Sequence, residues 1–220
     1  MKLTEIDRLN ITYFGGMSLP DREKALRVKI AAEFEKLARK YLLALQSIFA
    51  SGKPKAQLDA LAAAAAAAFA REYKSLFDNW YNRYYAEISS GASQSAVKAQ
   101  QWRDKHSAQL AVWLAETARN TPAGSAMSRL LTDIRTEVNA MCNLAVFCAL
   151  ADSGAKAKKW RAHKDELTRA THARADGQTV PIDQPFIVGG YALMFPGDTS
   201  LGAPPQEIVN CRCVMQRAKL

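Results

Sequence analysis

The sequence predicts a mainly α-helical protein, in which an N-terminal helical bundle is followed by a small, loop-rich α+β C-terminal module. Apolar residues recur every three or four positions through most of residues 21–154, which is the spacing of one face of a helix. Prolines, glycines and short β-prone runs gather in residues 177–205 instead. Hydrophobic residues make up 49% of the 220 residues, so the chain can bury a core of ordinary size.

The first helix is expected at about residues 21–50, followed by a second that starts soon after Pro54. Residues 51–54 separate them, because Gly52 favours a helix end and Pro54 disfavours helical backbone in the residue before it. The stripe of the first helix is Ile30, Phe34, Leu37, Tyr41, Ala44 and Ile48.

The second helix contains an alanine run at residues 62–68 and an aromatic segment at residues 80–85. Small side chains let a neighbouring helix approach closely, so we favour a close helix crossing over a mobile low-complexity tract. The helical spacing of Trp80 and Tyr84 favours core positions, and the alternative is stacking on nucleic-acid bases beside Arg83.

A third helix follows the break at residues 89–91, and a fourth follows a loop at residues 121–124 and stops near Gly154. Four amphipathic stripes admit several packing orders. We therefore predict a helical body at residues 1–154 and a C-terminal module at residues 155–220. Short strands are expected near residues 186–188 and 191–195, and turns at Asp176-Gly177 and at Pro196-Gly197-Asp198.

The formal net charge of +9 favours acidic partners, meaning nucleic acid, an acidic protein surface or anionic lipid. A basic run lies at the junction of the two parts. A solvated charged face is its usual explanation, and the alternative is sequence-independent contact with DNA phosphates. The run consists of Lys156, Lys158, Lys159, Arg161 and Lys164.

Residues 1–10 lack the apolar stretch of a secretory signal, and the longest apolar run, residues 60–70, is shorter than the roughly 20 residues that span a bilayer. We expect a soluble protein without a membrane span. Four cysteines in a chain of this length do not form a dense disulfide framework, which favours a reducing compartment.

Cys211 and Cys213 flank Arg212, and in an extended segment both thiols would point to one face. Together with His172, and with His163 or Asp176 nearby, they could form a structural zinc site. We favour the simpler interpretation of packed or hydrogen-bonded side chains, and a disulfide or redox role is the third alternative. No other cofactor is expected.

His172 and Asp176, four residues apart, also have the composition of an acid and base pair, but general-base chemistry needs a substrate cleft that the sequence does not indicate. The chain has no Gly-rich phosphate loop, no His-Glu-x-x-His helix and no Gly-x-Ser-x-Gly elbow. We therefore expect no enzyme.

The C-terminal module also carries a long ordered motif. Its order and spacing resemble the C-terminal domain of the phage Mu F-like minor head proteins, over roughly residues 130–215, with a departure at residues 162–167, where many relatives carry a small, arginine-richer turn. The motif consists of Trp160, Arg169, His172, Asp176, Gly177, Asp183, Phe186, Pro196, Gly197, Asp198, Asn210, Cys211, Arg212 and Cys213.

This resemblance implies a minor head or head morphogenesis protein, present at low copy number in the phage head near the portal or capsid interior and assembled in the host cytoplasm. The implied partners are portal, capsid or scaffold proteins and the packaged double-stranded DNA. A DNA-binding or ejected internal head protein is the alternative, and a nuclease is the weakest one. Some relatives continue into a toxin or nuclease domain, but only seven residues follow Cys213, so we expect no such domain.

Overall fold

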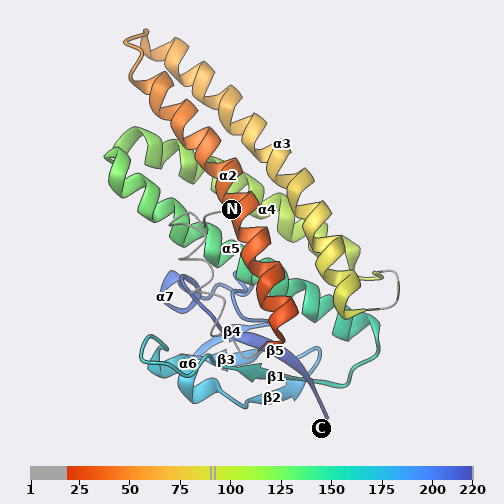
Figure 1. Cartoon of the computed structure of the whole chain (residues 1–220). Helices are drawn as coiled ribbons and strands as arrows, with labels where there is room; N and C mark the ends of the chain where they lie inside the picture. Colours follow the sequence, from red (N-terminus) through yellow and green to blue (C-terminus); the bar gives the residue numbers. More distant parts are fainter. Residues whose placement is uncertain (1–18, 90, 92, 220) are drawn as a thin grey trace.

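Four long helices precede a small module of strands and short helices in the computed structural model, which describes residues 19–89, 91 and 93–219 (Figure 1). The predicted mainly α-helical class is confirmed. The prediction about a signal sequence falls on residues 1–10, which lie outside the described residues. The long helices are α2 (Asp21–Phe49), α3 (Lys55–Ile88), α4 (Ala96–Asn120) and α5 (Ala123–Asp152).

Prolines set the starts of three of these helices. Pro20, Pro54 and Pro122 stand directly before α2, α3 and α5, with φ angles of −55°, −55° and −54°. The ring fixes φ near this value and removes an N–H that would otherwise need a partner at a helix start. The loop predicted at residues 121–124 is therefore shorter than expected, because α5 already begins at Ala123.

Helices α2 and α3 form an antiparallel hairpin whose tip extends beyond α4 and α5 (Figure 1). The rings of Tyr41 and Phe69 meet edge to face at 5.6 Å, and Trp80 donates its indole N–H to Glu33 at 2.8 Å. In the alanine run Ala62 is buried, and Ala65, Ala66 and Ala68 are half-buried and pack against the core. The close helix contact expected there therefore involves one face of the run and not the whole of it.

The aromatic segment of α3 lies in the core. Trp80, Tyr81, Tyr84 and Tyr85 are all less than 5% exposed, which confirms the core interpretation and rules out base stacking by these four rings. The core continues into the module, where it includes Trp160. Because residues of both parts share this core, it does not separate them at residue 154, and the boundary between two domains there stays a prediction.

The module contains two small antiparallel sheets. In the first, β1 (Ala157–Arg161) lies between β2 (Thr179–Pro181) and β5 (Val214–Ala218). The second is a hairpin of β3 (Phe186–Val188) and β4 (Tyr191–Leu193), both close to the predicted strands. Two short helices, α6 (Ala170–Ala175) and α7 (Pro205–Ile208), complete the module at the end opposite the hairpin tip (Figure 1).

The two predicted turns have scaffold roles, as expected. Gly197 has φ +89°, and a Cβ there would lie 2.8 Å from the Cβ of Ala140 on α5, so only glycine fits the turn against that helix. Asp198 is fully buried and accepts backbone N–H groups from Met194 and Ser200, each at 2.8 Å. Gly177 has φ +83°.

Within the described residues, one helix, Gly124–Asp152, is long and apolar enough to cross a membrane, with a mean hydropathy of 1.2. Inside this protein, 72% of its most apolar window is buried. A helix buried in a protein core passes the same test of length and composition, so this finding is only weak evidence for a membrane span.

Candidate functional site

The segment that carries the two module cysteines lies against α5. Asn139 donates its side-chain N–H groups to the carbonyl oxygens of Cys211 at 2.7 Å and Cys213 at 3.2 Å. Asn143 adds a bond to the same Cys213 carbonyl at 3.1 Å. Asn210 turns the chain with φ +56°, a region that asparagine tolerates better than most residues. Buried carbonyls need such partners, so the two asparagines fix the path of this segment.

A buried arginine lies behind this contact. Arg27 of α2 is fully buried, donates to the Tyr84 hydroxyl at 3.1 Å and also donates to the side-chain oxygen of Asn139. Burial alone would lower the pKa of Arg27, but the neighbouring Tyr84, Cys142 and Glu23 outweigh it and raise the pKa. Asn139 therefore connects a charged group of the bundle to the backbone of the module.

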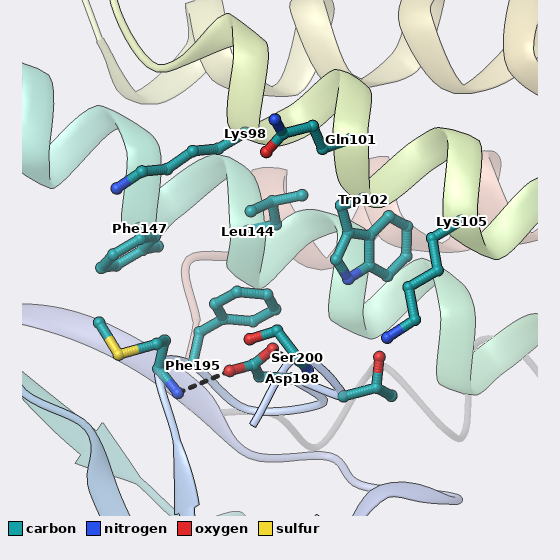
Figure 2. A pocket seen from close by; sticks show the side chains of 11 residues that line it. Lys98, Gln101, Trp102, Lys105, Leu144, Phe147, Phe195, Asp198 and Ser200 are labelled. Atoms are coloured by element: carbon teal, nitrogen blue, oxygen red, sulfur yellow. Dashed lines mark hydrogen bonds between the residues drawn. The ribbon is translucent and has the colours of Figure 1, made fainter. Parts of the chain in front are cut away.

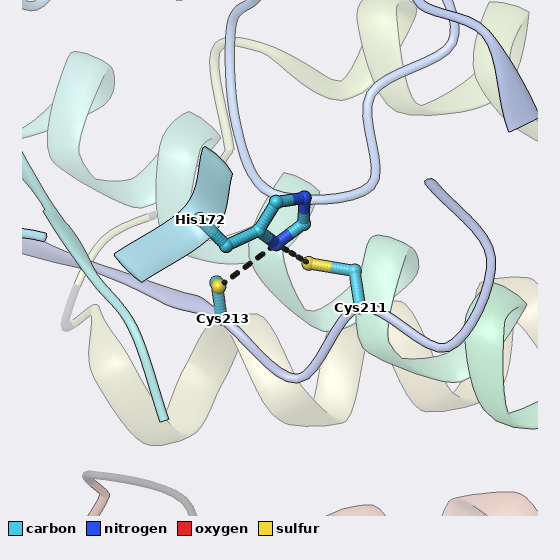
Figure 3. Close-up of side chains that lie close together, drawn as sticks. All are labelled: His172, Cys211 and Cys213. Carbon is cyan, nitrogen blue, oxygen red and sulfur yellow. Dashed lines mark hydrogen bonds between the residues drawn. The ribbon is translucent and has the colours of Figure 1, made fainter. Parts of the chain in front are cut away.

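His172 of α6 brings the two thiols together. Its Nδ1 lies 3.3 Å from Cys213 Sγ and 3.7 Å from Cys211 Sγ, and all three side chains are about 2% exposed. The three ligand atoms lie within 4.8 Å of one another. Figure 3 shows both sulfurs directed at the same nitrogen. The structure thus assembles the three residues that the sequence indicated as candidate metal ligands.

The other side of the His172 ring meets a carboxylate that sequence reasoning missed. Nε2 lies 3.1 Å from Oε2 of Glu207, which also accepts the Thr171 hydroxyl at 2.8 Å. A Cβ on Gly189, which has φ +60°, would collide with the Glu207 carboxylate. Glu207 lies four residues before Cys211 but 35 residues after His172, so no local sequence pattern signals this contact.

The pKa values of the two thiols are shifted in opposite directions. The hydrogen bond from Cys213 lowers the pKa of Cys211 well below its usual value, with a further contribution from His172. The same hydrogen bond, followed by burial, raises the pKa of Cys213. Burial would lower the pKa of His172, but the hydrogen bond and the charge of Cys211 outweigh it and raise the pKa.

Asp176 and His163 lie outside the described cluster of His172, Cys211 and Cys213. Asp176 instead accepts the Ala162 N–H at 3.0 Å and pairs with Lys164 at 2.7 Å. An acid and base pair of His172 and Asp176 is therefore wrong, because each carboxylate oxygen of Asp176 is already engaged in the scaffold.

His163 lies 3.3 Å from Asp165. Asp165 also accepts both terminal nitrogens of Arg212, and this pairing lowers the pKa of Asp165 to about 2. The family-motif residue Arg212 therefore points away from the sulfurs and ties the segment to the loop before α6.

Other motif residues hold the module together. Trp160 is fully buried and packs edge to face on the His172 ring at 5.7 Å and on Phe186 at 5.4 Å. Arg169 donates to the carbonyl oxygen of Val209, next to the cysteine segment. Asp183 is exposed.

The basic run divides between surface and core. Lys156 and Lys164 are exposed, and Lys159 and Arg161 are half-buried. Lys158 is fully buried, so DNA contact is wrong for this residue. The physical reason is its place on β1: Nζ donates to the Met194 carbonyl at 2.7 Å and lies over the rings of Phe147 and Phe186, which cover the charge.

A pocket of about 320 Å³ opens between α4, α5 and the loop after β4 (Figure 2). It combines an apolar floor with two lysines and one carboxylate, and it is separate from the His172 cluster. Its lining includes Lys98, Trp102, Lys105, Phe147, Phe195 and Asp198.

The fold and the motif define a helical protein with a compact C-terminal module of strands and short helices. The family described as phage Mu protein F like protein matches residues 81–216, more than half of the chain. The chain therefore belongs to the phage Mu protein F like family, as its motif predicted. This is a family of structural phage head proteins, so membership indicates a head morphogenesis protein and virion component, and does not indicate an enzyme.

Among curated proteins, the chain is similar to the NAD(+)--arginine ADP-ribosyltransferase EFV of Enterococcus faecalis (strain ATCC 700802 / V583). The two are 39% identical over 56 residues, which is 26% of this chain and 11% of that enzyme. The chain thus spans about a tenth of the length of this relative. No solved structure matches the chain.

We predict that Asn139→Ala lowers the free energy of unfolding by about 3 kcal/mol, because it removes a hydrogen-bond partner from two buried carbonyls and from the buried charge of Arg27. Urea unfolding followed by circular dichroism measures this. Asn82→Ala, at an exposed position of α3, is the matched control and should change stability by less than about 0.5 kcal/mol. Equal effects of the two substitutions would contradict the proposed role of Asn139.

A second prediction concerns Lys158. Burial lowers the pKa of Lys158 to about 8, and the negative charges of Asp198 and Asp183 offset part of this shift. Between about pH 8 and 10.5 the unfolded lysine holds a proton that the folded one has lost, so this group makes stability rise with pH.

Relative to Lys158→Met, the wild-type protein should therefore gain about 2 kcal/mol of unfolding free energy from pH 7 to pH 10. Denaturant titrations of both proteins at the two pH values measure the difference, since other titrating groups are common to both. Parallel pH profiles would show that Lys158 keeps an ordinary pKa.

Proposed function

We propose that this protein is a minor head protein of a tailed bacteriophage, built into the head near the portal or on the capsid interior. The observation that carries the proposal is the family match over residues 81–216, which takes in the end of α3, all of α4 and α5 and nearly all of the module. Its action is binding and assembly, with portal, capsid or scaffold proteins as partners.

The α2–α3 hairpin is the proposed docking arm. Most of it lies outside the matched range, and its tip extends away from the module (Figure 1). Leu43 and Leu61 are 54% and 38% exposed near this tip. Each lies six residues from the end of its helix at the connecting loop, so they stand at a similar level of the hairpin, and alanines 63, 64 and 67 of α3 are exposed as well. Such a patch offers apolar contact area to another head protein.

The second candidate is an internal head protein that contacts packaged DNA and leaves with it. The net charge of +9 favours it, because a basic surface attracts phosphate without regard to sequence. The exposed members of the basic run, Lys156 and Lys164, stay candidate contacts, although Lys164 pairs with Asp176.

Mass spectrometry of purified full virions and of DNA-emptied virions tests both candidates. We expect a few to some tens of copies of the chain in full virions and the same number after emptying. Loss on emptying would favour the ejected protein. Absence from both preparations would contradict a head component, and an assembly factor that departs would then explain the family membership.

The docking arm makes a further prediction. The double variant Leu43→Glu with Leu61→Glu should fold normally, since both side chains are exposed, and its copy number per virion should fall at least tenfold in a complementation assay. Val112→Glu with Leu201→Glu changes two residues that are equally exposed but lie on α4 and in the module, and is the control. Equal incorporation of both variants would exclude the hairpin tip as the docking surface.

A further inference from the structure

We propose that His172, Cys211 and Cys213 bind a zinc ion, which ties α6 to the segment before β5. This site goes beyond the role in the phage head and does not depend on it. The three residues come from two segments that lie about 40 residues apart in the chain, so a shared ion would crosslink the module through its core.

The distances fit a tetrahedral site. Zinc binds thiolate sulfur at about 2.3 Å and imidazole nitrogen at about 2.0–2.1 Å, which places nitrogen and sulfur about 3.6 Å apart around one ion. In the structure the two nitrogen–sulfur distances are 3.3 Å and 3.7 Å. Both nitrogen–sulfur distances are therefore close to those around a zinc ion, and the three ligand atoms lie within 4.8 Å of one another.

Glu207 prepares His172 for this role. Metal-binding histidines usually donate their second ring N–H to a carboxylate, which fixes the tautomer and strengthens the ligand. Nε2 lies 3.1 Å from Glu207, and the neutral tautomer that donates to this carboxylate leaves the lone pair of Nδ1 facing the two sulfurs. The Thr171 hydroxyl and the close approach of Gly189 hold the carboxylate in place.

A buried hydrogen-bond donor also lies beside the sulfurs. The indole nitrogen of Trp160 is buried and interacts with the thiol of Cys213. A metal-bound thiolate carries more negative charge than a thiol, so it is a better acceptor for this buried donor. Two soft sulfur ligands and one imidazole favour zinc over magnesium or calcium, which prefer oxygen. A tetrahedral site needs a fourth ligand as well, and a water molecule is the candidate for that position.

Elemental analysis of the full-length protein, purified without chelator, tests the site. We expect one zinc per chain in the wild-type protein. Cys211→Ser, Cys213→Ser and His172→Gln should each lose most of it. Cys142→Ala and Cys148→Ala remove the two buried helix cysteines and should keep it. Cobalt added to the zinc-free protein should give a thiolate-to-cobalt charge-transfer band and the visible bands of a tetrahedral ion.

Glu207→Gln tests the positioning role of the carboxylate. Zinc affinity, measured by competition with a chromophoric chelator, should weaken roughly 10–100-fold while the stoichiometry stays at one. Glu166→Gln, at an exposed position of the same module, is the control and should leave the affinity unchanged.

Folded wild-type protein without zinc and without a cobalt charge-transfer band would overturn the proposal. A disulfide between Cys211 and Cys213, found by thiol titration in protein purified under reducing conditions, would overturn it as well. The wild-type cobalt titration decides the question even where a ligand variant fails to fold.

Discussion

The hydrogen bonds from Asn139 and Asn143 to the backbone of residues 210–213 are the contact on which the rest of the structure depends. They turn the carbonyl oxygens of Cys211 and Cys213 toward α5 and so leave both thiols facing α6. A buried carbonyl that loses its partner costs more than a single surface bond contributes, so this segment has few alternative paths. The position of the cysteine segment in the module therefore depends on the side chains of Asn139 and Asn143 of α5.

Two buried charges are held by different means. Arg27 keeps its charge because Tyr84 and Asn139 accept its N–H groups, and it connects α2, α3 and α5 at one point. Lys158 has one carbonyl acceptor and two ring faces, and burial lowers its pKa to about 8. A guanidinium with several acceptors tolerates burial better than an ammonium with one, which agrees with the opposite pKa shifts of the two groups.

The long helices could be predicted because their apolar stripes repeat over many turns and a proline precedes three of the four, whereas β1 could not. Its sequence, Ala-Lys-Lys-Trp-Arg, has the composition of a solvated charge run, and only the strands on both sides and the rings above Lys158 bury it. The site divides in the same way. The Cys-x-Cys spacing of Cys211 and Cys213 identifies them in the sequence as candidate ligands. Glu207, in contrast, meets His172 only because α6 and α7 pack together, and no local sequence pattern encodes that contact.

The two parts of the chain face different constraints. Residues of the module are bound to one another and to α5 through fixed polar contacts, so a change at one position disturbs several others. The distal half of the α2–α3 hairpin contacts α4 through Arg119, which pairs with Asp59 and lies over Phe49, but it also carries exposed alanine and leucine. These exposed side chains can change at little cost to the fold. If the hairpin is the docking arm proposed above, contacts with a partner can change on the arm while the polar contacts that hold the module stay fixed.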